Sequence, residues 1–230
     1  MSSDASAATE AIVRRAHERF ATEWRRVCVA TDGFFAKLMV GQWIFGIVVA
    51  LTFSPYGWEG KVKNVHMHVW IAVVLGAITA SLPMVLASAR PGWVGTRHVI
   101  AAAQMVFSGL FIHLSGGRIE THFHVFGSLG FLAFYRDWPV LVTASLVTAV
   151  DHLIRGIAWP ESVYGTLTPE SWRVLEHVFW VLFAGIGLGI SCIRSRKEMR
   201  LIAERGAEIE ALAEAEWRRS SVVDRVKATA

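Results

Sequence analysis

The sequence predicts an all-α integral membrane protein whose six transmembrane helices form three helical hairpins. Hydrophobic residues make up 53% of the 230 positions and charged residues only 18%. The hydrophobic residues collect in runs of about the 20 residues that an α-helix needs to cross a bilayer. Short polar segments separate these runs, which is typical of helices in lipid and excludes a soluble domain.

Six apolar runs define the predicted helices, and each is bounded by charged or turn-forming residues. The fourth run is the shortest. Because the hydrophobic pattern fades gradually at each end, the boundaries are defined to within a few residues. In chain order the runs are Phe35–Phe53, His66–Ala87, His98–Leu114, Thr121–Tyr135, Trp138–Ala158 and Arg173–Ile193.

The chain divides by composition into residues 1–33, 34–193 and 194–230. The first segment is rich in arginine and places apolar residues such as Phe20 and Trp24 on one helical face. Such a pattern predicts an amphipathic helix that lies on a membrane surface. The middle segment is the six-helix transmembrane domain.

The third segment is charged and predicts a helical linker that continues the sixth span as a stalk. Its apolar residues step by three and four, which is the spacing of a short parallel coiled coil and indicates a homodimer. A solvated helical tail explains the same spacing. The predicted seam consists of Met199, Ile202, Gly206, Ile209 and Ala213.

Lysine and arginine collect before the first run, after the second and fourth, and after the sixth. Cytoplasmic loops carry this excess in membrane proteins, so both termini are expected in the cytoplasm. The chain is then a multi-pass protein with the lipid bilayer as its partner. Because the basic residues flank spans and form no single patch, the net charge of +4 gives no case for binding nucleic acid.

Most of the nine histidines fall near the outer ends of the spans, whereas His17 and His98 fall on the cytoplasmic side. His66 fits an ordinary interfacial residue. Ionisable groups within spans normally face an interior site, and imidazole is a common ligand of transition metals. The candidate metal ligands are His68, His113, His122, His124, His152 and His177, with Glu120, Asp151 and Glu176.

A short repeat orders these candidates, because the triplet His-Val-aromatic begins at His68, His124 and His177. If the hairpins pack around a common axis, these three histidines converge as metal ligands, joined by His113 or His152. Residues two apart point in nearly opposite directions on a helix, so only one histidine of each His-x-His pair can face the axis. The repeat favours the second of each pair.

The bound group is predicted to be a transition metal ion, with Cu, Fe and Zn all compatible with imidazole ligands. Haem b held by two of the histidines, in a sensor or an electron carrier, is the alternative. Proton sensing and a structural role also stay open. A membrane metalloenzyme of the di-iron oxygenase type generally needs more ligands, and a transporter needs polar residues through the whole membrane depth. These arguments favour a chain without catalytic activity, with no catalytic residue assigned, and a di-iron type membrane metalloenzyme stays a further alternative.

Several motifs resemble the membrane input region found at the front of bacterial sensor histidine kinases and related signalling proteins. The resemblance covers about residues 30–195 and implies a sensory role in the inner membrane, signalling to a cytoplasmic output domain or a partner kinase. No kinase, cyclase or methyl-accepting domain follows in this sequence. The motifs are Gly116-Gly-Arg-Ile-Glu-Thr-His-Phe-His-Val-Phe-Gly-Ser-Leu, Phe131-Leu-Ala-Phe-Tyr-Arg-Asp-Trp138, Asp151-His152 and Trp159-Pro-Glu-Ser-Val-Tyr-Gly165.

Overall fold

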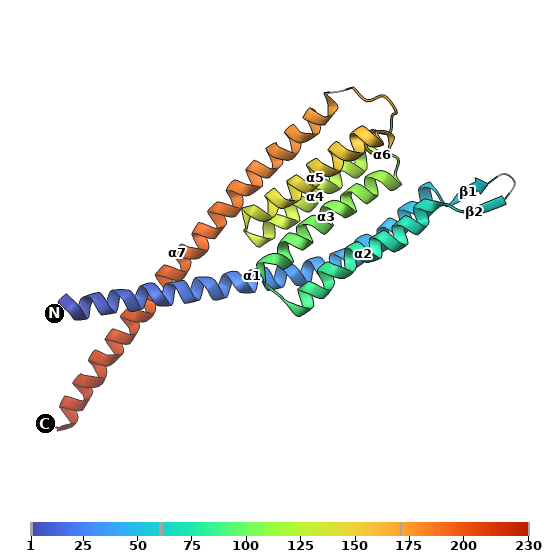
Figure 1. Ribbon diagram of the computed structural model, residues 1–230. Helices are drawn as coiled ribbons and strands as arrows, with labels where there is room; N and C mark the ends of the chain where they lie inside the picture. The colour runs from blue at the N-terminus through green and yellow to red at the C-terminus, as the bar shows by residue number, and fades with distance from the viewer. Residues whose placement is uncertain (1, 60–61, 171, 230) are drawn as a thin grey trace. The chain divides into compact units, whose positions relative to one another are not determined.

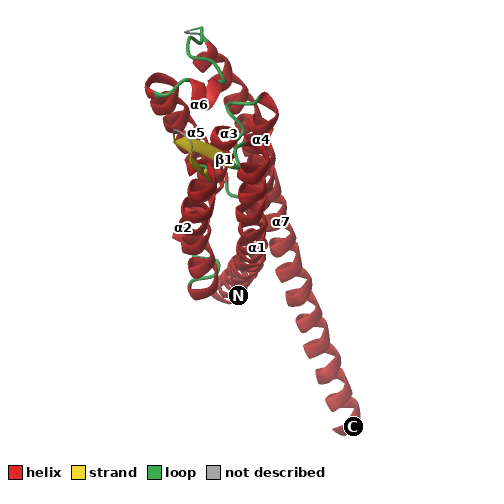
Figure 2. Ribbon diagram, turned by 90° about the vertical axis from the view of Figure 1, so that its right-hand side faces the viewer, coloured by secondary structure: helices red, strands yellow, loops and turns green. Residues whose placement is uncertain are grey.

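The computed structural model describes residues 2–59, 62–170 and 172–229, and this part of the chain is almost entirely helical (Figure 2). The predicted all-helical class is confirmed. One small antiparallel hairpin, β1 (Tyr56–Glu59) with β2 (Val62–Val65), adds to it between the first two helices. The helices are α1 (Ser2–Phe53), α2 (Met67–Ala89), α3 (Val94–Leu114), α4 (Ile119–Leu132) with the 3-10 turn η1 (Ala133–Tyr135), α5 (Trp138–Ala158), α6 (Glu161–Tyr164) and α7 (Arg173–Thr229).

The contacts divide the chain into two units, each with its own internal packing. We call Val27–Ile193 the membrane unit, and Met1–Arg26 with Arg194–Ala230 the terminal unit. The long helices α1 and α7 each contribute to both units (Figure 1).

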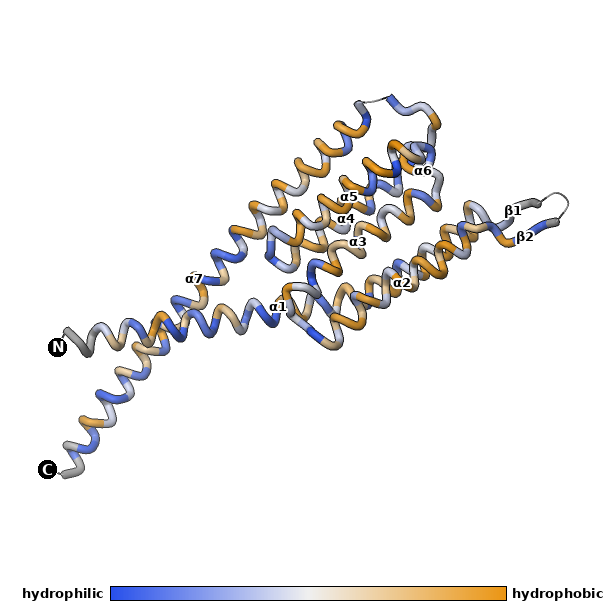
Figure 3. Tube along the Cα trace, in the orientation of Figure 1, coloured by the Kyte–Doolittle hydropathy of each residue, from blue (hydrophilic) through white to orange (hydrophobic). Residues whose placement is uncertain are grey.

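Five of the described helices, α1, α2, α3, α5 and α7, are long and apolar enough to cross a membrane. Their apolar stretches stand out along the chain in Figure 3, in contrast to the polar ends of α1 and α7. The fourth predicted span is α4, which has 14 residues. At a rise of about 1.5 Å per residue such a helix is about 21 Å long, which is less than the thickness of the hydrocarbon layer. The prediction of six spans is therefore not confirmed.

Helix α3 forms the core of the membrane unit. It packs against α2, α4, α5 and α6. In its most apolar stretch of 18 residues, 72% of the residues are buried. Small residues such as Ala101, Ala103 and Gly109 let the neighbouring helices approach it closely. The predicted arrangement of three hairpins around a shared axis is likewise not confirmed, because a helix occupies the centre.

Two turns at one end of the membrane unit are held together by glycines. Gly116 and Gly117, between α3 and α4, have positive φ angles of 72° and 75°, and Gly165 after α6 has φ 66°. A Cβ at Gly117 would collide with the backbone of Gly165. The Gly-Gly and Tyr-Gly elements of the sequence motifs thus permit a close backbone contact that fixes the ends of α3, α4 and α6 near one another.

In the terminal unit, the first part of α1 pairs with the last part of α7. Arg15 donates to both carboxylate oxygens of Glu214 at 2.9 and 3.1 Å, and Arg19 pairs with Glu210. The guanidinium of Arg196 lies 3.9 Å from the ring centre of Trp24. These contacts come from the same chain, so α1 is a helical partner that the coiled-coil prediction did not include.

The predicted coiled-coil seam divides between two environments. Gly206 lies against Arg19 of α1. In contrast, Ile202 and Ile209 are 71% and 67% exposed. The intramolecular pair therefore leaves Ile202 and Ile209 of the seam uncovered.

We expect Gly117→Ala to destabilise the membrane unit. A left-handed backbone costs a residue with a Cβ about 1–2 kcal/mol, and the collision with Gly165 adds to this cost. Thermal unfolding in detergent, followed by far-UV circular dichroism, should show a lower Tm. Gly127→Ala is the matched control, because a Cβ added at this α4 glycine would have nothing within 4 Å. A Tm for Gly117→Ala equal to that of the control would contradict the role of the turn contact.

Candidate functional site

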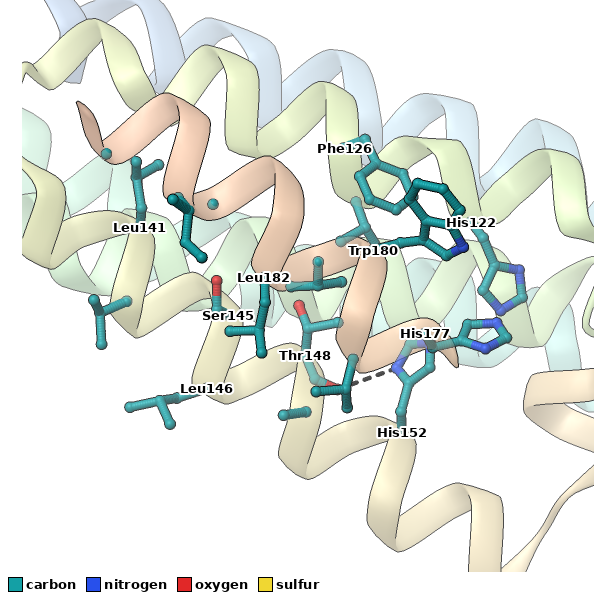
Figure 4. A pocket seen from close by; sticks show the side chains of 18 of the residues that line it. His122, Phe126, Leu141, Ser145, Leu146, Thr148, His152, His177, Trp180 and Leu182 are labelled. Atoms are coloured by element: carbon teal, nitrogen blue, oxygen red, sulfur yellow. Dashed lines mark hydrogen bonds between the residues drawn. The ribbon is translucent and has the colours of Figure 1, made fainter. Parts of the chain in front are cut away.

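Three histidines from three helices lie together in the membrane unit: His122 of α4, His152 of α5 and His177 of α7. Their ring centres form a triangle with sides of 5.3, 5.6 and 5.7 Å. His122 and His152 are buried and His177 is half-buried. The three rings turn toward one another beside an apolar cavity (Figure 4). We call this group the three-histidine cluster.

All three imidazoles make the same local hydrogen bond. The Nδ1 atom lies 2.9 Å (His122), 3.1 Å (His152) and 2.8 Å (His177) from the backbone carbonyl oxygen four residues earlier. A carbonyl oxygen only accepts, so Nδ1 carries the proton and donates it in each ring. In a neutral imidazole the Nε2 atom then has a free lone pair, which is the arrangement that metal-ligating histidines adopt.

Two polar atoms at the cluster are buried and have no hydrogen-bond partner among the described residues: Nε2 of His122 and the hydroxyl of Tyr164. The Tyr164 ring lies 5.5 Å from the ring of His177. Burial raises the pKa of the Tyr164 hydroxyl, so the group stays protonated and able to donate. Unpaired buried polar atoms are costly, and a bound group at this place would supply a partner that the described residues do not.

The three predicted carboxylates have different environments. Asp151 lies beside the cluster, with Oδ2 3.3 Å from Nδ1 of His152, and also pairs with Arg155 at 2.5 Å. Glu120 is exposed and lies 3.6 Å from Arg118. Glu176 is exposed and lines the cavity. Of the three predicted carboxylates, only Asp151 is thus in contact with a cluster histidine.

The cavity beside the cluster has a volume of about 810 Å³ and lies between α4, α5 and α7. Its walls are almost entirely apolar, with residues such as Leu141, Leu146 and Leu182, and the histidines stand at one end (Figure 4). Helix α7 packs loosely here, since only 6% of the residues in its most apolar 18-residue stretch are buried. Few apolar contacts therefore hold α7 in place, and His177 adds a polar contact to them.

His124 takes part in a different, fully paired network between α1, α3 and α4. Its Nε2 accepts from the amide of Gln42 at 2.9 Å, and its Nδ1 lies 2.7 Å from the hydroxyl of Ser108. Gln42 and Gln104 exchange two amide hydrogen bonds of 2.8 Å, and Ser128 donates to Gln104. Both ring nitrogens of His124 are thereby occupied by protein atoms.

His68 and His113 lie in a third place, with ring centres 4.8 Å apart. The ring of His66 meets that of His68 edge-on, with centres 4.3 Å apart. Thus the structure distributes His68, His124 and His177, the three ligands favoured by the repeat, over three separate sets of contacts. It is the first histidine of the pair in α4, His122, that meets His152 and His177. Within the described ranges, no group of three or more His, Cys, Asp or Glu side chains already has the arrangement needed to hold a metal ion.

A buried polar cluster near the start of α3 is a feature that the sequence did not predict. Arg97 Nε lies 3.0 Å from Asp137 Oδ2, with both side chains under 8% exposed, and Arg97 also donates to the sulfur of Cys28. Tyr135 donates to Asp32 at 2.6 Å. Tyr135 and Asp137 belong to the Phe131–Trp138 motif, which was the one feature of the sequence that pointed to this cluster. The position of Arg97, in contrast, suggested only a charge outside the membrane.

Comparison with known proteins gives one relevant similarity. The chain is 29% identical over 118 residues to the transducer protein Htr8 of Halobacterium salinarum, an alignment that covers 49% of this chain and 17% of the transducer. No protein-family model matches the chain, and no solved structure matches it.

These observations define the class of protein at a coarse level. The apolar helices and the similarity to a transducer support a membrane-associated helical protein related to signalling proteins. The chain corresponds to a small part of the transducer's length. The more specific resemblance, to the input region of sensor histidine kinases, stays a prediction.

We expect replacement of one member of the Arg97–Asp137 pair to cost more than replacement of both. Arg97→Met removes the guanidinium that pairs with the buried Asp137 carboxylate; breaking a buried pair typically costs about 3–5 kcal/mol, whereas apolar residues at both positions are often tolerated. Tm values of Arg97→Met, Asp137→Leu and the double variant in detergent test this. Arg26→Met is the control, because its ion pair with Glu23 is exposed and such pairs contribute about 0–1 kcal/mol. Additive losses in the double variant would contradict the pairing.

Proposed function

We propose that this protein is a membrane sensory module that binds a transition metal ion at His122, His152 and His177 and relays the state of this site through α7. The observation that carries the proposal is the shared tautomer of the three rings. Each Nδ1 donates to a backbone carbonyl, so three Nε2 lone pairs from three helices are available beside one another. Neutral imidazoles in this form are ligands for Cu, Fe and Zn.

The spacing of the rings supports the same site. Imidazoles that share one tetrahedral metal ion at the usual metal–nitrogen distance of about 2 Å have ring centres about 5 Å apart. The three separations, 5.3, 5.6 and 5.7 Å, are slightly wider than this. The rings would have to move inward and turn their Nε2 atoms to one centre when the metal ion binds. Three imidazoles leave a fourth position open for an additional ligand.

The proposed relay through α7 depends on the difference in packing between α7 and its neighbouring helices. His152 and His122 belong to helices held by α3, whereas α7 has few buried residues and faces the cavity. Metal binding at His177 would favour the arrangement in which α7 lies close to α4 and α5. A ligand shifts a conformational equilibrium only by its difference in affinity between the two states, and a site divided between fixed and loose helices provides this difference.

The membrane topology and partners follow from the sequence and belong to the proposal. The distribution of basic residues supports both termini in the cytoplasm, several passes through a bacterial inner membrane, and the three-histidine cluster near the periplasmic side. α4 then enters the membrane as a short sixth segment. The exposed Ile202 and Ile209 support a homodimer of the stalk, which would act on a cytoplasmic output domain or partner kinase.

Haem b is a second candidate, because an apolar cavity of about 810 Å³ adjoins the three histidines. A haem needs such an apolar space together with axial imidazoles. An absorption spectrum of the purified protein separates the two candidates, since a strong Soret band would establish haem. Activity as an oxygenase has no comparable support, because His122, His152 and His177 have a single carboxylate, Asp151, in contact with them among the described residues.

We expect His122→Gln to remove the metal ion bound at the three-histidine cluster, since it deletes one of its three imidazole ligands. Protein purified in detergent, loaded with Zn²⁺ and dialysed, would be assayed by mass spectrometry of the metal, with circular dichroism as the check on folding. His98→Gln is the control, because His98 bonds to Thr143 and not to the cluster. His124→Gln should also keep this metal ion, which separates the cluster from the sequence-based assignment. Equal metal content in His122→Gln and His98→Gln would overturn the proposed site.

A further inference from the structure

A second group of histidines, His66, His68 and His113, lies outside the three-histidine cluster. The Nδ1 atom of His68 is buried and has no hydrogen-bond partner among the described residues. The ring centre of His68 lies 4.3 Å from that of His66 and 4.8 Å from that of His113. The Trp159 ring centre lies 4.8 Å from that of His113. An unpaired ring nitrogen among other imidazoles is the same signal that marks His122 in the first cluster.

A chain of polar side chains lies between this group and the three-histidine cluster. His113 Nδ1 is 2.9 Å from the Ser162 hydroxyl, which accepts from Arg155 at 2.9 Å. Arg155 donates to Asp151 at 2.5 and 2.8 Å, and Asp151 lies 3.3 Å from His152. The guanidinium carries a permanent positive charge, so it separates two imidazole groups instead of allowing one metal cluster to span both.

The contact between α3 and α5 leaves space for this chain of polar side chains. Gly109 of α3 lies against the Asp151–Arg155 pair, and a Cβ at this position would come within 3.1 Å of both side chains. The ion pair therefore occupies space that a side chain on α3 would otherwise fill. Its position between the two histidine groups is fixed by packing as well as by hydrogen bonds.

We infer that His68 and His113, with His66 as a third imidazole, form a second mononuclear transition-metal site, distinct from the three-histidine cluster. The free Nδ1 of His68 is the first ligand. His113 offers Nε2 in the tautomer in which its Nδ1 donates to the Ser162 hydroxyl. His66 now accepts the backbone N–H of His68 through Nδ1 at 3.1 Å, so it joins the metal ion only by giving up this helix cap. The site takes a metal that favours nitrogen ligands, such as Zn²⁺ or Cu²⁺.

Metal stoichiometry with Zn²⁺ alone tests this second site separately from the proposed function. The wild-type protein, freed of metal by a chelator and then reloaded, should bind two ions per chain. His68→Gln and His122→Gln should each bind one, and the double variant none. His113→Gln is a second variant for the new site and should also bind one. His98→Gln is the control and should bind two.

The outcomes separate the two sites, provided that circular dichroism shows each variant to be folded. Two ions retained in both His68→Gln and His113→Gln would overturn the second site. One ion in the wild type, lost only in His122→Gln, would also overturn it and leave the proposed function standing. One ion lost only in His68→Gln and His113→Gln would support the second site and overturn the three-histidine cluster as a metal site.

Discussion

The need to pair every polar atom buried among apolar helices governs this molecule. An unpaired polar group in such a setting costs more than a hydrogen bond normally contributes, because no water replaces the missing partner. The Gln42–Gln104–His124 network meets this need completely, and Arg97 with Asp137 meets it with an ion pair. The exceptions stand out for this reason. The unpaired ring nitrogens of His68 and His122 belong to the two histidine groups where we propose bound metal.

The helices differ in how firmly they are held, and this difference gives the proposed site its function. Helix α3 is surrounded by its neighbours, whereas α7 has few buried residues next to a large apolar cavity. The histidine of α7 is therefore in a position to report on a bound ligand, since it joins a loosely packed helix to firmly packed ones. A metal ion held only by α3 and its close neighbours would stabilise the fold without moving a helix.

Much of the fold could be predicted from the sequence, because apolar runs of membrane-spanning length depend on composition alone. The helical class and most helix boundaries followed from them. The packing could not be predicted in the same way. Helix α4 is buried on two sides, with His124 and Ser128 toward α1 and α3 and His122 toward α5 and α7, so helical periodicity could not decide which histidine faces the site.

Other features depend on contacts between distant segments that leave no local signal. The pairing of Arg15 with Glu214 joins the two ends of the chain, and nothing in either segment specifies the other. Arg97 is a buried partner of Asp137 although its position suggested a charge at the membrane surface. The set of candidate ligands was predicted, but its division into separate groups was not, because the repeat of His-Val-aromatic does not correspond to a shared position in space.

The central claim is that a metal ion at the three-histidine cluster holds α7 against α4 and α5. A pulsed electron paramagnetic resonance experiment tests it, with spin labels at Val150→Cys on α5 and Phe183→Cys on α7. Both positions are exposed and do not line the cavity, and Cys28 and Cys192 would be replaced by Ala. We predict a shorter and narrower distance distribution with Zn²⁺ than with chelator, and no such change in His122→Gln. Identical distributions in the two conditions would contradict the account.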